Sequence, residues 1–173
     1  MKGRRIEAVA DSSTYVALDI AGILEKTVLL FNPIHLPIQV RRELRRRRGR
    51  RDRLHQLRGV VRNCHQYDAV AGRLLLGKGR DAGQRDLGEV EAIQQAVALG
   101  ATLLVDDSWG RSIAQKMGLT CIGSIGVLER LHELRLLNLD DVRSAVVRMM
   151  DGGIRLPIEY LKSKGWLEEP ETR

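Results

Sequence analysis

The chain contains 173 residues, of which 43% are hydrophobic and 29% charged, and it carries a net charge of +7. Its length suits one domain with a hydrophobic core, and only two cysteines, Cys64 and Cys121, exclude a disulfide scaffold or a cysteine-based zinc site. No stretch approaches the roughly 20 apolar residues of a membrane span, and no apolar run follows the basic N-terminus as in a secretory signal. We therefore expect a cytoplasmic protein without a membrane partner, with one domain over residues 1–165 and a polar tail over 166–173.

The first elements alternate between strands and helices. The cluster Asp11-Ser12-Ser13 follows a short apolar run and is typical of a helix N-cap, while Leu36-Pro37 suits the first turn of a further helix. The pattern predicts strands over 6–10 and 28–31, helices over 14–24 and from Leu36 into a run of arginines, and a helical hairpin or broken helix around Gly49 that resumes with Leu54, Leu57 and Val61.

A basic segment follows the second predicted helix. Residues 41–53 hold nine arginines against Glu43 and Asp52, so this segment carries +7, the net charge of the whole chain. Such a concentration indicates a polyanionic partner, most often nucleic acid, although a solvated helix face or an exposed basic loop has the same composition. Only 3% of the residues are aromatic, which favours contacts with phosphates over base stacking. The candidate nucleic-acid-binding residues are Arg41, Arg42, Arg45, Arg46, Arg47, Arg48, Arg50 and Arg51.

The second half of the chain resumes the alternation after a glycine-rich, charged loop over 76–88. Gly100 and Gly118 stand where C-terminal glycine caps belong, and the run 101–105 (ATLLV) is typical of a strand buried on both faces. Strand–helix alternation favours a parallel sheet with helices on both faces. The expected elements are helices over 89–99, 109–117, 124–134, 140–150 and 157–164, and strands over 101–105 and 119–122.

Acidic residues follow two of the predicted strands. Asp11 comes directly after the first strand, and Asp106 and Asp107 come directly after ATLLV. Ligands of open α/β sheets bind beyond the carboxyl ends of the strands, so these carboxylates converge on one crevice if the two strands are neighbours. A helix cap for Asp11 and a turn for the Asp106-Asp107 pair are the alternatives.

Three glutamates on predicted helices complete the set of candidate acids. At ~100° per residue, Glu89 lies about 40° from the apolar Ile93, and Glu91 lies about 160° from it. We therefore expect Glu89 to reach inward and Glu91 to face solvent, where its charge stabilises the helix N-terminus. Glu43 either points into a cleft or pairs with Arg47 one turn later, and the spacing favours the pair.

Several carboxylates around one crevice repel one another unless a cation neutralises them. Their hard oxygen atoms select Mg²⁺ or Mn²⁺, which can activate a water molecule and stabilise the charge on phosphorus during in-line displacement. A basic segment beside such a crevice is the arrangement that a nuclease requires. Other chemistries lack their motifs: Gly77-Lys78-Gly79 does not match a P-loop, the four histidines lack metal-ligand spacing, and no serine or cysteine stands in a G-x-S-x-G elbow.

Six motifs occur along the chain in a recognisable order. They are VADSS (9–13), LPIQVRREL (36–44), LGEVEAI (87–93), LLVDDSWGRSIA (103–114), IGSIGVLERLHELRLL (122–137) and GGIRLPIEYLKSKG (152–165). Together they resemble the PIN-domain family of metal-dependent ribonucleases. The chain is most similar to a prokaryotic branch of nucleic-acid-binding proteins that resembles the toxins of toxin–antitoxin pairs.

The resemblance implies a three-layer α/β/α fold with a central parallel sheet, and hydrolysis of single-stranded RNA with Mg²⁺ or Mn²⁺. It also implies a homodimer or higher oligomer and, for toxin-type members, an antitoxin protein as partner. A catalytically degenerate nucleic-acid-binding or regulatory module is the alternative. The implied catalytic acids are Asp11, Glu43, Glu89 and Asp107, the implied metal ligands are Asp11, Glu89 and Asp107 with Asp106 as a competitor, and Ser12 is the hydroxyl that supports the first acid.

Overall fold

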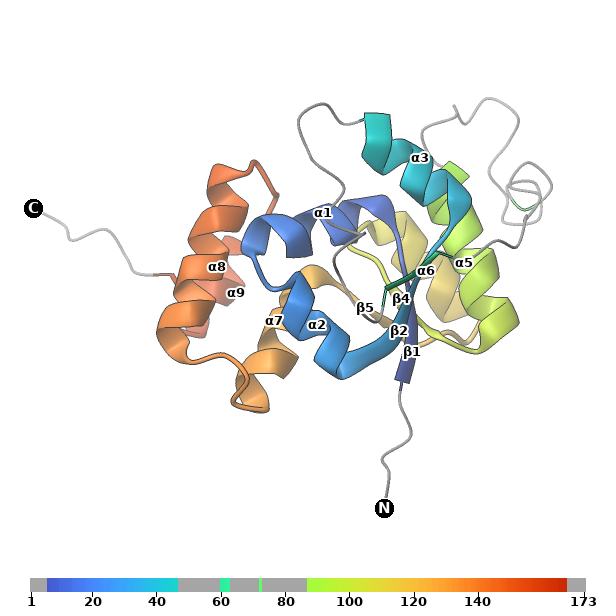
Figure 1. Cartoon of the computed structure of the whole chain (residues 1–173). Helices are drawn as coiled ribbons and strands as arrows, with labels where there is room; N and C mark the ends of the chain where they lie inside the picture. Colours follow the sequence, from blue (N-terminus) through green and yellow to red (C-terminus); the bar gives the residue numbers. More distant parts are fainter. Residues whose placement is uncertain (1–5, 47–59, 63–71, 73–86, 168–173) are drawn as a thin grey trace, which may run out of the picture.

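A parallel β-sheet forms the centre of the computed structural model, which describes residues 6–46, 60–62, 72 and 87–167 (Figure 1). The described strands are β1 (Ile6–Ala10), β2 (Phe31–Leu36), β3 (Val60–Arg62), β4 (Thr102–Leu104) and β5 (Cys121–Ile122). Their order across the sheet is β3-β2-β1-β4-β5, and all neighbours are parallel. β1 is central, since Ala8 pairs with Ile34 of β2 on one side and with Thr102 of β4 on the other. The residues that follow β1 and β4 therefore leave the sheet at the same edge.

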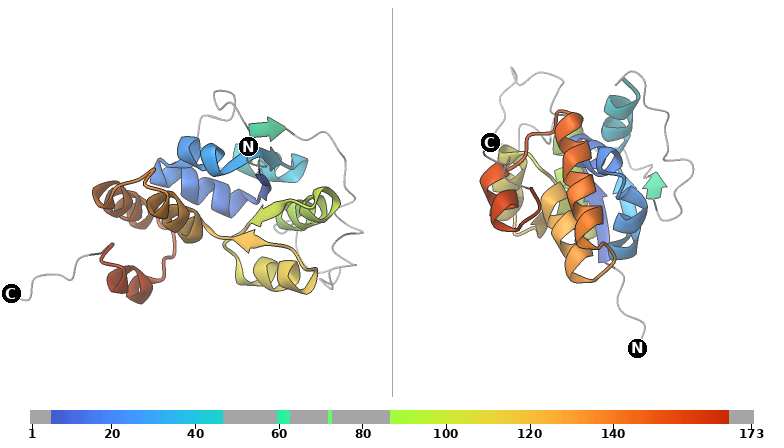
Figure 2. Two further views of the ribbon diagram at one scale, coloured as in Figure 1. Left: turned by 90° about the horizontal axis from the view of Figure 1, so that it is seen from below. Right: turned by 90° about the vertical axis from the view of Figure 1, so that its left-hand side faces the viewer.

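Helices cover both faces of this sheet. The described helices are α1 (Ser12–Ala21), α2 (Leu24–Leu30), α3 (Ile38–Arg46), α5 (Leu87–Leu99), α6 (Ser108–Lys116), α7 (Ser124–Glu133), α8 (Leu139–Asp151) and α9 (Ile158–Ser163). α1 and α2 lie on one face of the sheet, and α5 and α6 lie on the other (Figure 2). α7, α8 and α9 extend the molecule at the end away from α3 (Figure 1). The predicted α/β fold with three layers and a central parallel sheet is confirmed.

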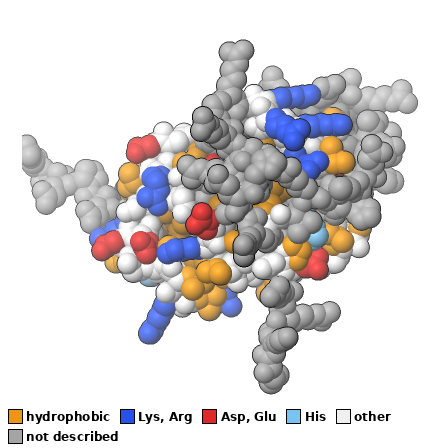
Figure 3. Space-filling view, in the orientation of Figure 1, with side chains coloured by type: hydrophobic (Ala, Val, Ile, Leu, Met, Phe, Trp, Pro, Cys, Tyr) orange, Lys and Arg blue, Asp and Glu red, His pale blue; other side chains and the backbone are white. Residues whose placement is uncertain are grey.

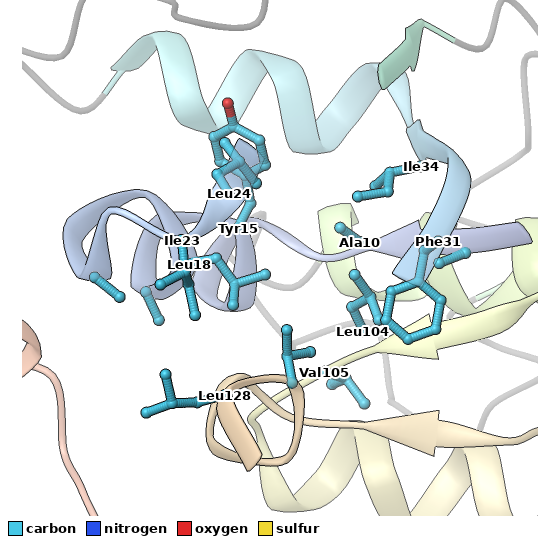
Figure 4. Close-up of a cluster of buried hydrophobic side chains, with 14 of the residues drawn as sticks. Ala10, Tyr15, Leu18, Ile23, Leu24, Phe31, Ile34, Leu104, Val105 and Leu128 are labelled. Carbon is cyan, nitrogen blue, oxygen red and sulfur yellow. The ribbon is translucent and has the colours of Figure 1, made fainter. Parts of the chain in front are cut away.

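The hydrophobic core lies between the sheet and the helices. One buried cluster draws Leu18 from α1, Phe31 from β2, Leu104 from β4 and Leu128 from α7, none more than 6% exposed (Figure 4). Side chains of this size stabilise a fold by about 1.5–3 kcal/mol each when fully buried. The core therefore fixes the strand ends, and with them the positions of the acids that follow.

Two sequence predictions for the first third of the chain are wrong. The segment 28–31 was expected to be a strand, but α2 continues through Leu30 and β2 begins at Phe31. A run of four apolar residues has no period that separates strand from helix, and the hydrogen bond from Thr27 N–H to the Ile23 carbonyl (2.9 Å) belongs to a helix. Val61, expected in a resumed helix, lies in β3; the expected hairpin around Gly49 lies outside the described residues.

The packed chain extends beyond residue 165. Trp166 is 4% exposed, and its ring stands edge-on to His132 with the ring centroids 6.1 Å apart. Leu167 also packs against the core, so these two residues of the expected tail belong to the domain. Among the described residues, no helix has the length and apolar character needed to cross a membrane.

Candidate metal-dependent active site

Asp11 lies at the carboxyl end of β1 and caps the N-terminus of α1. Its backbone N–H donates to the carbonyl of Leu104 (3.1 Å), which ties the end of β1 to β4. One carboxylate oxygen, Oδ1, accepts from the Thr14 N–H (2.8 Å), and Oδ2 accepts from the Ser13 hydroxyl (2.5 Å). Burial raises the pKa of Asp11, hydrogen bonds from Ser13 and Thr14 oppose that rise, and the negative charge of Asp106 adds to it. Asp11 is therefore both a helix cap and a buried carboxylate that faces a second acid.

Asp106 provides that second acid from the end of β4. Its Oδ1 accepts from the Ser124 N–H (2.8 Å) at the start of α7, and Arg111 Nη2 lies 3.6 Å from the same oxygen. Its Oδ2 is buried and has no hydrogen-bond partner in the described part of the chain. One oxygen thus fixes the carboxylate, and the other remains available at the edge of the sheet beside Asp11.

Asp107 has a different role in the local structure. It is the N-cap of α6, and its Oδ1 accepts from the N–H groups of Trp109 (2.8 Å) and Gly110 (3.2 Å). Its side chain is exposed, whereas Asp106 is partly buried and interacts with Asp11. Of the two acids that end the ATLLV strand, the geometry brings Asp106 to Asp11 and assigns the helix cap to Asp107.

Glu43 and Ser12 join α3 to the same edge of the sheet. The Ser12 hydroxyl donates to Glu43 Oε2 (2.6 Å), and the Gly88 N–H donates to Glu43 Oε1 (2.8 Å). Ser12 is the chain neighbour of Asp11, so this pair places Glu43 next to the first acid. The expected partner of Glu43, Arg47, lies outside the described residues. The Ser12 hydroxyl therefore supports Glu43, whereas the sequence prediction assigned it to Asp11, whose hydroxyl donor is Ser13.

Glycines make room for three of the carboxylates. A Cβ atom built on each of these glycines would come within 3.0 Å of a carboxylate oxygen, a distance that real Cβ contacts essentially never show. A side chain at any of these three positions would therefore force the facing carboxylate to shift from its present place. The pairs are Gly88 with Glu43, Gly110 with Glu89, and Gly123 with Asp106. Glu89 reaches its place from α5 and stands against the first turn of α6.

Glu91 does not face solvent, contrary to the sequence prediction. It is 2% exposed, and its Oε2 accepts from the Gln39 N–H (2.6 Å) at the first turn of α3. Burial raises the pKa of Glu91, and the hydrogen bond from Gln39 opposes the rise. The helical angle relative to Ile93 was a poor guide because α5 packs against the sheet on one side and α3 on another, so two faces are buried.

The donor set fits a hard divalent cation. In the part of the chain that the structure describes, no three His, Cys, Asp or Glu side chains lie close enough to form a complete cage. The buried Asp11 nevertheless interacts with the like charge of the partly buried Asp106, and Asp106 Oδ2 has its hydrogen-bonding capacity unused among the described residues. Mg²⁺ is commonly held by one or two carboxylates and completes its shell with waters and substrate phosphates. Two fixed carboxylates are therefore sufficient protein ligands for such an ion.

Positive charge gathers beside these acids. Figure 3 shows Lys and Arg side chains together over α3, where the described candidates Arg41, Arg42, Arg45 and Arg46 lie. The other candidates, Arg47, Arg48, Arg50 and Arg51, lie outside the described residues. Sequence reasoning missed Arg111, whose Nε donates to the Val105 carbonyl (3.1 Å) and whose head lies beside Asp106. Its position one turn after the acidic pair was the available signal.

Comparison with known proteins agrees with this geometry. No curated protein matches the chain significantly. A family model described as a PIN domain matches residues 7–164, which includes all the described helices and strands apart from Ile6 at the start of β1. PIN domains are generally nucleases, which are hydrolases, and they usually use divalent metal ions. The match spans most of the sequence, and the chain belongs to the PIN-domain family.

Proposed function

We propose that this PIN domain is an endoribonuclease that hydrolyses phosphodiester bonds of single-stranded RNA with Mg²⁺ or Mn²⁺. The observation that carries the proposal is the pair formed by Asp11 and Asp106, two acids held at the carboxyl edge of a parallel sheet with one carboxylate oxygen unused. Such a pair is unfavourable without a cation, because the burial of the Asp11 carboxylate and its repulsion from Asp106 raise the free energy of the fold.

The side chains around the pair have separable roles. Asp11 and Asp106 would hold the ion, with Glu89 as the third candidate ligand and Asp107 as the less favourable one because it caps α6. A bound Mg²⁺ or Mn²⁺ would supply an activated water molecule and stabilise negative charge on the reacting phosphate. Ser13 and Thr14 orient Asp11, and the Ser124 N–H orients Asp106.

Glu43 is the remaining catalytic candidate. Its two oxygens accept from Ser12 and Gly88, which holds the carboxylate in place beside Asp11. In this proposal Glu43 would add negative charge beside a bound ion and would orient a water molecule near it. Its fixed position suits such a role, since catalytic groups act best when they need not rearrange during the reaction.

Cleavage of single-stranded RNA in the presence of Mg²⁺, Mn²⁺ or EDTA tests the proposal. We expect cleavage with either metal, none with EDTA, and none with Asp11→Asn. Asp151→Asn, which removes an exposed acid at the end of α8, serves as the control and should cleave normally. RNA binding without cleavage under every metal condition would instead favour a degenerate binding module.

The proposal includes the role of a toxin held inactive by an antitoxin protein, and a homodimer or higher oligomer as the working form. These parts rest on the resemblance of the motifs to toxin-type PIN domains. Induced expression in bacterial cells should arrest growth with the wild-type chain and leave growth unchanged with Asp11→Asn. Light scattering of the purified protein measures the oligomeric state. Normal growth with an active nuclease would remove the toxin role and leave the enzymatic one.

A further inference from the structure

A hollow lies beside the carboxylates, between α3 and the start of α5. Its volume is about 230 Å³, large enough for a phosphate group and its water molecules. It is contiguous with the candidate active site, because Glu43 belongs to both. The residues that line it are Gln39, Arg42, Glu43, Arg46 and Leu87.

The α3 residues in this hollow form one stripe of the helix. Gln39, Arg42, Glu43 and Arg46 follow the spacing i, i+3, i+4 and i+7, which places side chains on the same face. On a helix of a globular protein, that spacing usually carries the apolar residues that pack against the core. Here Val40 serves that purpose from a different face, and the stripe carries amide, carboxylate and guanidinium groups instead. The polar groups of the stripe suit it to bind a polar ligand.

The two guanidinium groups of the stripe are not neutralised by the acid between them. Both oxygens of Glu43 accept hydrogen bonds from Ser12 and Gly88, on the side toward the active site. Within the described ranges neither Arg42 nor Arg46 forms an ion pair, and both side chains are exposed. Two positive charges one helical turn apart repel each other, so an anion in the hollow would lower the free energy of this region.

The buried Glu91 keeps the stripe in place. Its carboxylate caps α3 through the Gln39 N–H (2.6 Å), and the charge of Arg42 contributes to holding this carboxylate ionised. An acidic group at a helix N-terminus stabilises the helix through the exposed N–H groups and the helix dipole. The arginines therefore stand on a helix whose first turn is anchored in the interior of the protein, rather than on a loose segment.

We infer that this hollow is a binding subsite for a phosphodiester group of the RNA, adjacent to the one that is cleaved. The inference rests on the proposed function in that the ligand belongs to the same nucleic acid. Arg42 and Arg46 donate to the phosphate oxygens in the bidentate manner that guanidinium groups favour, and the Gln39 amide adds a neutral donor. Glu43 lines the hollow and is bonded to Ser12, the neighbour of Asp11. The RNA therefore passes from the arginines onto the carboxylates.

Binding can be measured apart from cleavage. The probe is a short fluorescent single-stranded RNA with 2′-O-methyl riboses, titrated in EDTA over a series of salt concentrations and followed by fluorescence anisotropy. The test variant is Arg42→Gln with Arg46→Gln. The matched control, Arg130→Gln with Arg155→Gln, removes the same charge from exposed positions beyond the active-site edge. Arg42→Lys with Arg46→Lys keeps the charge and loses the bidentate geometry.

We expect the Gln pair to weaken binding roughly tenfold and to flatten the salt slope by about 1.4, since each lost contact with a single strand removes ~0.7. The Lys pair should keep the slope and bind with intermediate affinity, and the control should match wild type. Equal binding by wild type and the Gln pair would overturn the subsite, even if the protein cleaves RNA. Lost binding in the Gln pair would support it, even if no condition yields cleavage.

A competitor identifies the chemistry of the ligand. Polyglutamate at the same concentration of negative charge should displace the RNA poorly, because its carboxylates lack the geometry of a continuous phosphodiester backbone. Equal displacement by polyglutamate would show a non-specific anion surface and overturn the assignment of a phosphodiester. Circular dichroism melting of each variant verifies that the compared proteins are folded.

Discussion

The carboxyl edge of the sheet and the layer formed by α7, α8 and α9 differ in how their charged side chains are paired. In the helical layer, polar groups satisfy one another: Asn138 and Asp141 form a reciprocal capping box, and Glu129 accepts from both Tyr160 and Lys164. At the edge of the sheet, Asp11 is buried near another acid. The first arrangement stabilises the fold, and the second costs stability.

This contrast locates function better than the number of charges does. Both regions are rich in acids and bases, and an electrostatic inventory of the sequence does not separate them. The difference lies in burial, since a charge that is removed from water needs a partner, whereas a surface charge has water. A cation bound from solution would lower the free energy of such a cluster beyond what Arg111 supplies, which is why the edge of the sheet is the candidate active site.

The largest effect is expected when Asp106 and Asp107 are each replaced, because only Asp106 is assigned to the unfavourable cluster of acids. Asp106→Asn should lower RNA cleavage by roughly 10²–10³-fold, the scale on which loss of one group that stabilises the transition state acts. Asp107→Asn should retain most activity, because asparagine also caps helices well. Initial rates at saturating Mg²⁺ measure both. Loss of activity in Asp107→Asn alone would mean that the wrong member of the pair has been placed at the metal.

The cap of α3 provides the next largest effect. Glu91→Ala removes a buried acceptor from the Gln39 N–H and leaves a cavity, so the free energy of unfolding should fall by about 2–3 kcal/mol. Glu91→Gln keeps an acceptor oxygen and should remain within about 1 kcal/mol of wild type. Urea unfolding at pH 7 distinguishes them. If both substitutions were neutral, Glu91 would not anchor α3.

Without metal, replacing Asp11 should stabilise the protein, in contrast to the replacement of Glu91. The folded-state pKa of Asp11 is raised above 3.8, so its ionisation destabilises the fold as the pH rises from 3.8 through that raised value. Asp11→Asn cannot ionise and still caps α1, so in EDTA its Tm at pH 7 should exceed that of wild type. The advantage should vanish below about pH 3.8. A lower Tm for the variant at pH 7 would contradict the burial cost of the carboxylate.

The smallest effect is expected in the helical layer. Glu129→Gln weakens the contacts with Lys164 and Tyr160, and the Tm at pH 7 should fall by roughly 1–2 °C. The pKa of Glu129 is lowered and that of Lys164 is raised, so the pair is fully charged between pH 4.5 and 10.5. Its contribution is lost as the pH falls through the folded pKa of Glu129 or rises through that of Lys164. Calorimetric scans across this range measure it.

The fold was predictable because it depends on local patterns, and the same patterns placed the candidate acids at strand ends. ATLLV marks a strand between helices, and acids after two parallel strands share an edge once those strands are neighbours. The neighbour relation itself came from the order of the strands in the sheet, which no local pattern contains. The choice between Asp106 and Asp107 could not be made from the sequence either, because it depends on which of the two residues caps the N-terminus of α6.

Glu91 shows why the helices were harder to interpret than the strands. A helix with one buried face can be phased from its apolar residues, but α5 contacts the sheet and two other helices. Gly88, Glu91 and Gln95 are all buried on it, although none is apolar in the usual sense. Their burial depends on the position of α3, and that position is set by contacts between segments about 50 residues apart.

The close packing of carboxylates against Gly88, Gly110 and Gly123 has a consequence for inheritance. A descendant can keep every acid of the site and still have one carboxylate displaced by a single alanine at a position that carries no functional group. The catalytic residues of such a protein would look intact in its sequence, although the geometry of its site had changed. Deciding which members of a lineage have become pseudoenzymes therefore requires reading the glycines together with the acids.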